Sequence, residues 1–181
     1  MEFRRIEIEG LLLIEPKVFG DHRGYFFESF RQDRFDEAVG FPVFFVQDNE
    51  SRSNKGVLRG LHFQKPPVDQ GKLVRVSRGA VLDVVVDIRK SSPTYGMHYS
   101  VELTEENKLQ LWIPPGFAHG FVSLTDDTIF QYKCTNYYSP ENEGSILWND
   151  PGLGIDWKIT DPAVSDKDKN ALPLEKVESP F

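Results

Sequence analysis

Short apolar runs recur along the chain, and turn-forming residues separate them. In Ala80–Ile88 the even-numbered positions from Leu82 onward are all apolar, whereas the odd-numbered positions include Asp83 and Asp87. A period of two predicts a β-strand with one face drier than the other. Many short strands joined by turns predict an all-β sandwich or barrel. The strand-length runs are Leu11–Glu15, Tyr25–Phe30, Val43–Asn49, Val57–Gln64, Lys72–Ser77, Ala80–Ile88, Tyr99–Thr104, Leu109–Ile113, Gly120–Ser123 and Ile129–Thr135.

Helical patterns are scarce. Asp33–Val39 is the one clear candidate, with Asp33 predicted as its N-cap and Gly40 as its end. From Asp150 onward prolines and glycines interrupt the pattern, so we expect a tail packed over the barrel with one helical turn near Asp166–Asn170. Because no repeat or linker divides the chain, residues 1–181 are predicted to form one domain.

Composition narrows the classes of protein. Aromatic residues make up 13% of the chain against two methionines, which favours strands over a helical bundle. The net charge of −7 argues against a nucleic-acid partner. Cys134 is the only cysteine, which excludes an intrachain disulfide and a cysteine-based zinc site. No apolar run has the length of a signal peptide or a membrane span, so we expect a cytoplasmic protein without a membrane partner.

Two of the four histidines lie in unusual surroundings. His22 and His98 have polar, turn-like neighbours, but His62 and His119 lie beside glycines in apolar segments. A polar ring at such a position must find a partner or face a cavity. We therefore regard His62 and His119 as candidates for chemistry.

The segment from Pro114 to His119 resembles the second motif of the cupin barrels, in which the histidine is a ligand in the metal-dependent members. Those members add two histidines and a glutamate from a first motif. Here the position two after His62 is Gln64, and no glutamate follows nearby. Two imidazoles without a carboxylate make a poor zinc or iron site. We expect no metal and no other cofactor, and a pocket free for acid–base chemistry.

A more specific resemblance runs in order from about Glu15 to Asp168. Its segments resemble the dTDP-4-dehydrorhamnose 3,5-epimerase family. They are Phe19–Phe30, Phe45–Ser51, Gly56–Gln64, Gln70–Arg75, Asp87–Thr94, Trp112–Gly120, Tyr132–Tyr138 and Ile146–Asp150.

The resemblance implies a cupin jelly-roll barrel that works as a homodimer in dTDP-L-rhamnose biosynthesis. The implied substrate is dTDP-4-dehydro-6-deoxy-glucose, whose carbons 3 and 5 are inverted. Both carbons flank the ketone at carbon 4, which acidifies their C–H bonds. No redox or metal cofactor is then required.

The resemblance also implies the catalytic roles. His62 would be the base, since imidazole titrates near neutral pH, and Asp168 would orient it. Lys72 would stabilise the enolate, and Tyr132 would return a proton from the opposite face. Phe130, Tyr132 and Cys134 share one face of a predicted strand, so Tyr132 can point inward.

Substrate binding is assigned by the same resemblance. Tyr138 would stack on the thymine, and Arg23 and Glu28 would reach across from the other subunit. Arg59 and His62 fall on opposite faces of a regular strand, so a bulge at Gly60 is our hypothesis for bringing both to one pocket. The substrate-binding candidates are Arg23, Glu28, Gln47, Asp48, Asn49, Arg59, Lys72, His119, Tyr138, Glu143 and Lys167.

Three other interpretations stay open. A relative could epimerise only one carbon or isomerise the keto group, although Tyr132 favours the double epimerase. A non-catalytic cupin would have lost at least one of His62, Lys72 and Tyr132, and all three are present. A metal-dependent cupin dioxygenase is disfavoured by Gln64.

Overall fold

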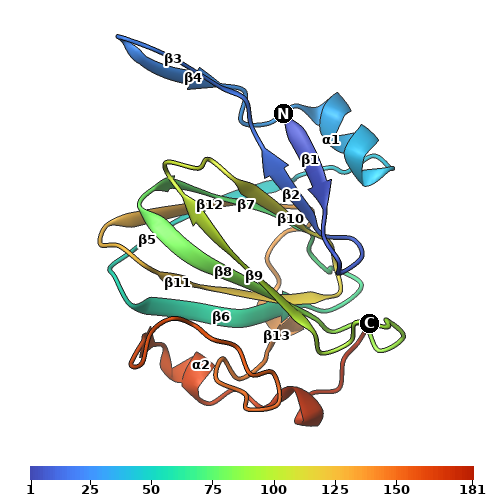
Figure 1. Ribbon diagram of the computed structural model, residues 1–181. Coiled ribbons are helices and arrows are strands. Elements are labelled where there is room, and N and C mark those ends of the chain that lie inside the picture. The colour runs from blue at the N-terminus through green and yellow to red at the C-terminus, as the bar shows by residue number, and fades with distance from the viewer.

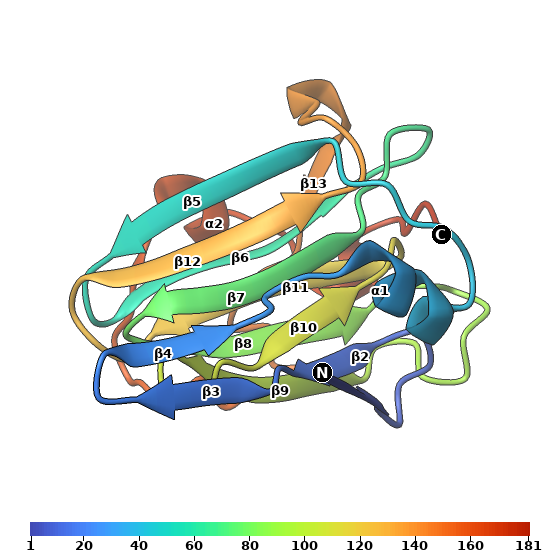
Figure 2. The same cartoon turned by 90° about the horizontal axis from the view of Figure 1, so that it is seen from above.

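Two antiparallel sheets face each other and form a barrel in the computed structural model, which describes residues 1–181 (Figure 1, Figure 2). The predicted all-β jelly-roll barrel is confirmed. Sheet I has the order β1 (Glu2–Arg5), β2 (Leu12–Glu15), β10 (Gln110–Ile113), β7 (Lys72–Arg78), β12 (Thr128–Cys134) and β5 (Gln47–Ser53). Sheet II has the order β13 (Glu143–Ser145), β6 (Val57–Gln64), β11 (Phe117–Ser123), β8 (Ala80–Asp87) and β9 (His98–Thr104), with β14 (Ala163–Val164) parallel to β6.

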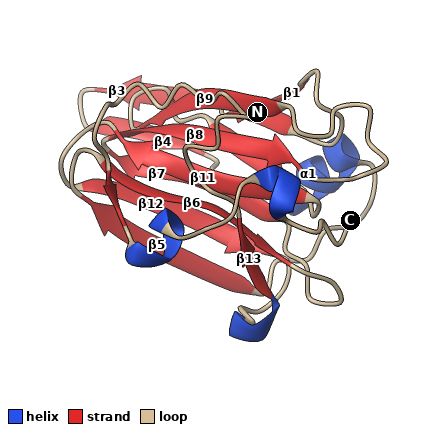
Figure 3. Cartoon of the chain, turned by 90° about the horizontal axis from the view of Figure 1, so that it is seen from below, coloured by secondary structure: helices blue, strands red, loops and turns tan.

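The helical elements are few and short, and they lie outside the strands (Figure 3). None of them is long and apolar enough to cross a lipid bilayer. They are α1 (Gln32–Val39), α2 (Asp166–Lys169) and the 3₁₀ turns Pro140–Asn142 and Leu174–Lys176.

The space between the sheets is filled by apolar side chains from both. Val74 and Phe130 of sheet I pack in one cluster with Val85 and Phe121 of sheet II. The rings of Phe121 and Phe130 stack with their centroids 4.1 Å apart, so an aromatic contact joins the two sheets.

Strand β8 is buried on both faces, which corrects the prediction that one face is drier than the other. Val85 faces the interior of the barrel, whereas Leu82 and Val84 pack against Trp157 and Leu174 of the C-terminal tail. The tail covers the outer face of sheet II beneath β6, as Figure 1 shows in orange and red. The predicted packing of the tail over the barrel is confirmed, and so is its helical turn, α2.

Helix α1 covers the outer face of sheet I. Its buried Phe35 packs edge-on against Trp112, with ring centroids 5.3 Å apart. The prediction that Gly40 ends the helix is confirmed, because Gly40 has a φ of +97°. The prediction of Asp33 as N-cap is wrong: Arg31 occupies that position, and the Asp33 carboxylate pairs with the Arg31 side chain at 2.7 Å instead.

Two predicted strands are displaced along the chain. The run Val43–Asn49 was expected as a strand, but Val43 packs beneath α1 and the strand is β5, Gln47–Ser53. Tyr25–Phe30 shortens to β4 (Gly24–Phe27), which pairs only with β3 (Val18–Asp21). This hairpin projects away from the barrel (Figure 1).

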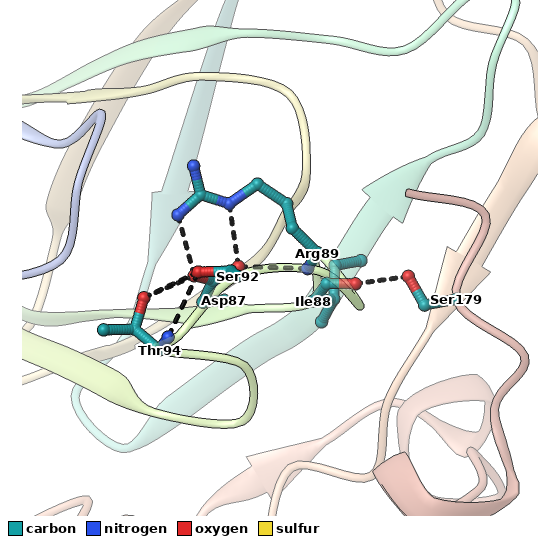
Figure 4. A network of polar contacts seen from close by, with 6 residues as sticks. All are labelled: Asp87, Ile88, Arg89, Ser92, Thr94 and Ser179. Atoms are coloured by element: carbon teal, nitrogen blue, oxygen red, sulfur yellow. Dashed lines mark hydrogen bonds and ion pairs between the residues drawn. The ribbon is translucent and has the colours of Figure 1, made fainter.

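A buried carboxylate organises the loop that follows β8 (Figure 4). Asp87 is fully buried and accepts hydrogen bonds from Arg89 at 2.7 Å, from Ser92 at 2.6 Å and from Thr94 at 2.7 Å. The Ser179 hydroxyl donates to the carbonyl oxygen of the next residue, Ile88, and so ties the end of the tail to the same loop.

Candidate active site

A cavity of about 680 Å³ lies between the two sheets, where the tail crosses β6. Sheet II supplies His62, and the facing sheet I supplies Lys72 and Tyr132. Asp168 reaches the cavity from α2. Residues far apart in the sequence therefore meet at one cavity whose opposite walls belong to different sheets.

His62 and Asp168 form a hydrogen-bonded pair. The distance from His62 Nε2 to Asp168 Oδ1 is 2.6 Å, and the carboxylate is almost fully buried. Burial raises the pKa of Asp168, but the hydrogen bond and charge of His62, together with Ser165 and the Gly60 amide, lower that pKa below its usual value. An ionised carboxylate at this position favours a proton on Nε2, which leaves the lone pair of Nδ1 available to act as a base.

Lys72 and Tyr132 are partly buried polar residues on the facing wall. The structure gives neither side chain a hydrogen-bond or ion-pair partner within the chain. Burial lowers the pKa of Lys72, although the acidic groups around it, Cys134, Glu143 and Asp83, oppose this. Burial raises the pKa of Tyr132, so its phenol keeps its proton at neutral pH. The wall thus presents an amino group and a proton donor to the cavity.

A second histidine–aspartate pair lies deeper in the barrel. His119 Nε2 is 2.8 Å from Asp83 Oδ2, and both side chains are buried. The other carboxylate oxygen, Oδ1, has no hydrogen-bond partner. Sequence reasoning missed Asp83, although an aspartate at an inward position of a buried strand was a signal that could have found it.

A bulge brings Arg59 and His62 to the same cavity. Along β6, His62 pairs with His119 and Arg59 pairs with Phe121, so three steps on β6 face two on β11. Gly60 lies between them with a φ of +132°, and an added Cβ there would lie 2.5 Å from the Cα of Gly120. The hypothesis of a bulge at Gly60 is confirmed, and the close backbone approach explains both glycines.

A second cavity of about 300 Å³ shares His62, Lys72 and Tyr132 with the first. The residues that line this cavity and not the first are Gln47, Asn49, Phe63, Gln64, Gln70, Tyr138 and Glu143. The Tyr138 hydroxyl donates to Glu143 Oε2 at 2.9 Å, and Lys167 Nζ pairs with the same oxygen at 2.5 Å. Burial raises the pKa of Glu143, but Lys167 and Tyr138 lower it by a larger amount. The pKa of Glu143 is therefore below its usual value.

Three of the predicted binding residues do not line either cavity of their own chain. Arg23 lies on the projecting β3–β4 hairpin and pairs with Asp21 at 2.5 Å. Glu28 follows the same hairpin and is exposed. Asp48 points outward from β5 because successive side chains along a strand alternate between faces, and its neighbours Gln47 and Asn49 face inward. Its carboxylate pairs with Lys133 at 3.1 Å.

No group of three or more His, Cys, Asp or Glu side chains comes close enough together to hold a metal ion. His62 and His119 are each paired with an aspartate, at 2.6 and 2.8 Å.

Comparison with known proteins gives a consistent result. A family model described as dTDP-4-dehydrorhamnose 3,5-epimerase matches residues 5–176. The enzyme of that name from Salmonella typhimurium is 58% identical over 170 residues, which cover 93% of each chain. The crystal structure of dTDP-6-deoxy-D-glucose-3,5-epimerase from Legionella pneumophila in complex with dTDP-4-keto-L-rhamnose is 51% identical, with a TM-score of 0.93 over 98% of this chain and 94% of that one. A 3′-monoepimerase from Streptomyces bikiniensis in complex with dTDP-quinovose is 40% identical, with a TM-score of 0.90 over 94% of this chain and 86% of that one.

A jelly-roll barrel with a His–Asp pair on one wall and a lysine and a tyrosine on the other defines a cupin-type epimerase, an isomerase. Within that class, the chain belongs to the dTDP-4-dehydrorhamnose 3,5-epimerase family.

Proposed function

We propose that this protein inverts carbons 3 and 5 of dTDP-4-dehydro-6-deoxy-glucose to give dTDP-4-dehydro-L-rhamnose, a step of dTDP-L-rhamnose biosynthesis. The observation that carries the proposal is the placement of His62 and Tyr132 on facing walls of one cavity. Inversion at carbon needs a proton to leave from one side and another to return from the opposite side. A base and an acid on facing walls meet that requirement.

The first half of each inversion is deprotonation. His62 takes the proton from the carbon next to the ketone, and the electron pair of the broken C–H bond moves into the carbonyl group to form an enolate. Asp168 holds the imidazole and stabilises the imidazolium that forms. Lys72 has no carboxylate partner within the chain, so its side-chain nitrogen is free to donate a hydrogen bond to the enolate oxygen.

The second half is reprotonation from the other side. The phenol of Tyr132 donates its proton to the carbon, and the enolate returns to the ketone. The raised pKa of Tyr132 keeps the phenol protonated before this step. His62 then releases its proton to solvent and the Tyr132 phenolate takes one from solvent, which resets both groups for the second carbon. No cofactor enters the proposed reaction.

The second cavity is the proposed site for the nucleotide. Tyr138 offers an exposed aromatic face to the thymine, and Gln47 and Asn49 offer amide groups beside it. Arg59 and His119 line the first cavity, where they are proposed to contact the sugar and the phosphates. Lys167 also lines the first cavity and pairs with Glu143 of the second. Asp48 faces outward, and for this reason we leave it out of the proposed subsite.

The working unit is proposed to be a homodimer. The β3–β4 hairpin projects from the barrel and exposes Phe19, Tyr25 and Phe26, of which Phe26 is 70% exposed. A second copy is the proposed cover for these rings, which brings Arg23 and Glu28 to the partner's cavity. The cytoplasm is the proposed location because the only cysteine, Cys134, is a buried free thiol.

A second candidate is epimerisation at one carbon only, which is favoured by the similarity to the 3′-monoepimerase structure. Incubation with dTDP-4-dehydro-6-deoxy-glucose in deuterated water separates the two. The double epimerase incorporates deuterium at carbons 3 and 5 and gives the L-rhamno configuration by NMR. Deuterium at a single carbon, with inversion there alone, establishes the monoepimerase instead.

A further inference from the structure

Gln64 is a buried polar residue that the proposed chemistry does not use. It ends β6 and is only 4% exposed. Its side-chain amide donates to the carbonyl oxygens of Val68 and Tyr137, the latter at 3.0 Å, and its Oε1 accepts from the backbone amide of Ser139 at 2.9 Å. One side chain therefore holds the residue before Tyr138, the residue after it, and the neighbouring loop.

The backbone of Gln64 reaches the other end of the same tyrosine. It pairs with Glu143 of β13, and Glu143 accepts the hydrogen bond of the Tyr138 hydroxyl at 2.9 Å. The Tyr138 backbone amide itself donates to Gln47 Oε1 at 3.0 Å. The main chain on both sides of Tyr138 and the acceptor of its hydroxyl are thus anchored to β6, although the ring is exposed.

Only a carboxamide supplies what this position requires. The side chain gives two donated hydrogen bonds and accepts one, which matches the two N–H groups and the oxygen of glutamine. An ionised glutamate has no donor, and a neutral histidine has one donor and one acceptor. The requirement also explains a glutamine where metal-dependent cupins place a histidine.

We propose that Gln64 is a positioning residue for the nucleotide-base subsite, which fixes the Tyr137–Ser139 segment so that the Tyr138 ring stands ready for a planar base. The inference rests on the proposed function, in which Tyr138 stacks on thymine. A fixed ring loses less conformational entropy when the base binds, so Gln64 contributes to nucleotide affinity rather than to proton transfer.

The test uses two variants. Gln64→Met removes the side-chain amide, and Gln64→Glu keeps the shape and the acceptor but loses the two N–H donors. The control is Ser179→Ala, because Ser179 is equally buried and its hydrogen bond joins the tail to the loop after β8, outside both cavities. We expect each Gln64 variant to raise KM and the Kd of dTDP about 10-fold, with kcat within about threefold of the wild type. We expect Ser179→Ala to leave KM and the Kd of dTDP unchanged. If one of the two Gln64 variants fails to fold, the other still provides the test.

A double-mutant cycle with Tyr138→Ala then separates positioning from general structural damage. If Gln64 acts through the ring, Gln64→Met adds less than about a twofold change once the ring is gone. An equal effect in both backgrounds, an unchanged KM, or a loss confined to kcat overturns the inference. Failure of the proposed function looks different, since wild-type protein would then neither bind dTDP nor epimerise the substrate.

Discussion

Asp87→Asn tests the electrostatic anchor of the loop after β8. Burial raises the pKa of Asp87, but the hydrogen bonds from Arg89, Ser92 and Thr94 lower it by a larger amount. The net effect takes the pKa from 3.8 to about 2. A depressed carboxyl pKa contributes stability that is present above the unfolded-state pKa and is lost as pH falls through the folded-state pKa. The shift corresponds to about 2 kcal/mol of folding free energy at neutral pH.

The linkage gives a pH-dependent signature. We expect Asp87→Asn to lower the free energy of unfolding by about 2 kcal/mol at neutral pH, and the difference from wild type to shrink by about 1 kcal/mol at about pH 3. Urea unfolding at fixed protein concentration measures both values. Asp161→Asn is the control, since Asp161 is exposed and has no side-chain partner. A difference between the wild type and the Asp87→Asn variant that is the same at both pH values refutes the reasoning, because the loss would then not come from the ionised carboxylate.

Three further predictions concern the site and the assembly. Asp168→Asn leaves the fold intact but lowers kcat by at least about 100-fold, because the imidazole loses the carboxylate that sets its tautomer; equal kcat values for wild type and variant would contradict the pairing. Exhaustive chelation leaves activity unchanged, and metal bound in stoichiometric amount with activity lost on its removal would contradict this. Phe26→Asp shifts the protein toward monomer in sedimentation without unfolding it, because a charge replaces an exposed ring of the hairpin; an unchanged dimer would place the interface elsewhere.

Hydrophobic alternation was enough to find the strands of the barrel interior. β12 carries apolar side chains at inward positions, so its period of two identifies it and places Tyr132 on the same face as Phe130. In β8 the regular apolar positions, Leu82 and Val84, face the tail instead, and the inward face carries Asp83. β5 is different, since its inward positions hold Gln47, Asn49 and Ser51. A strand that lines a polar cavity lacks the apolar pattern. The pattern therefore predicts a strand at the apolar residues just before β5 instead, from Val43 onward.

The site itself depends on contacts that no local pattern encodes. Asp168 lies in the tail, in a run of alternating aspartates and lysines. No apolar period there marks a residue as inward-facing, and only the family resemblance identifies Asp168 as a candidate. The structure shows what places it: Ser165 caps α2 by accepting from the Asp168 amide at 3.2 Å, and His62 meets the carboxylate. The Asp83–His119 pair likewise requires two strands to lie side by side, which the sequence does not display.

The most direct test of the account uses Tyr132→Phe in deuterated water. If His62 removes the proton and Tyr132 returns one from the facing wall, the variant keeps His62, Asp168 and Lys72 and still forms the enolate. We expect substrate hydrogen to continue to exchange with solvent, as measured by mass spectrometry, while the yield of inverted product, measured by NMR, falls by about 10²-fold or more. Exchange and inversion that fall together by the same factor, or that both persist at the wild-type rate, would contradict the assignment of Tyr132 as the acid opposite His62.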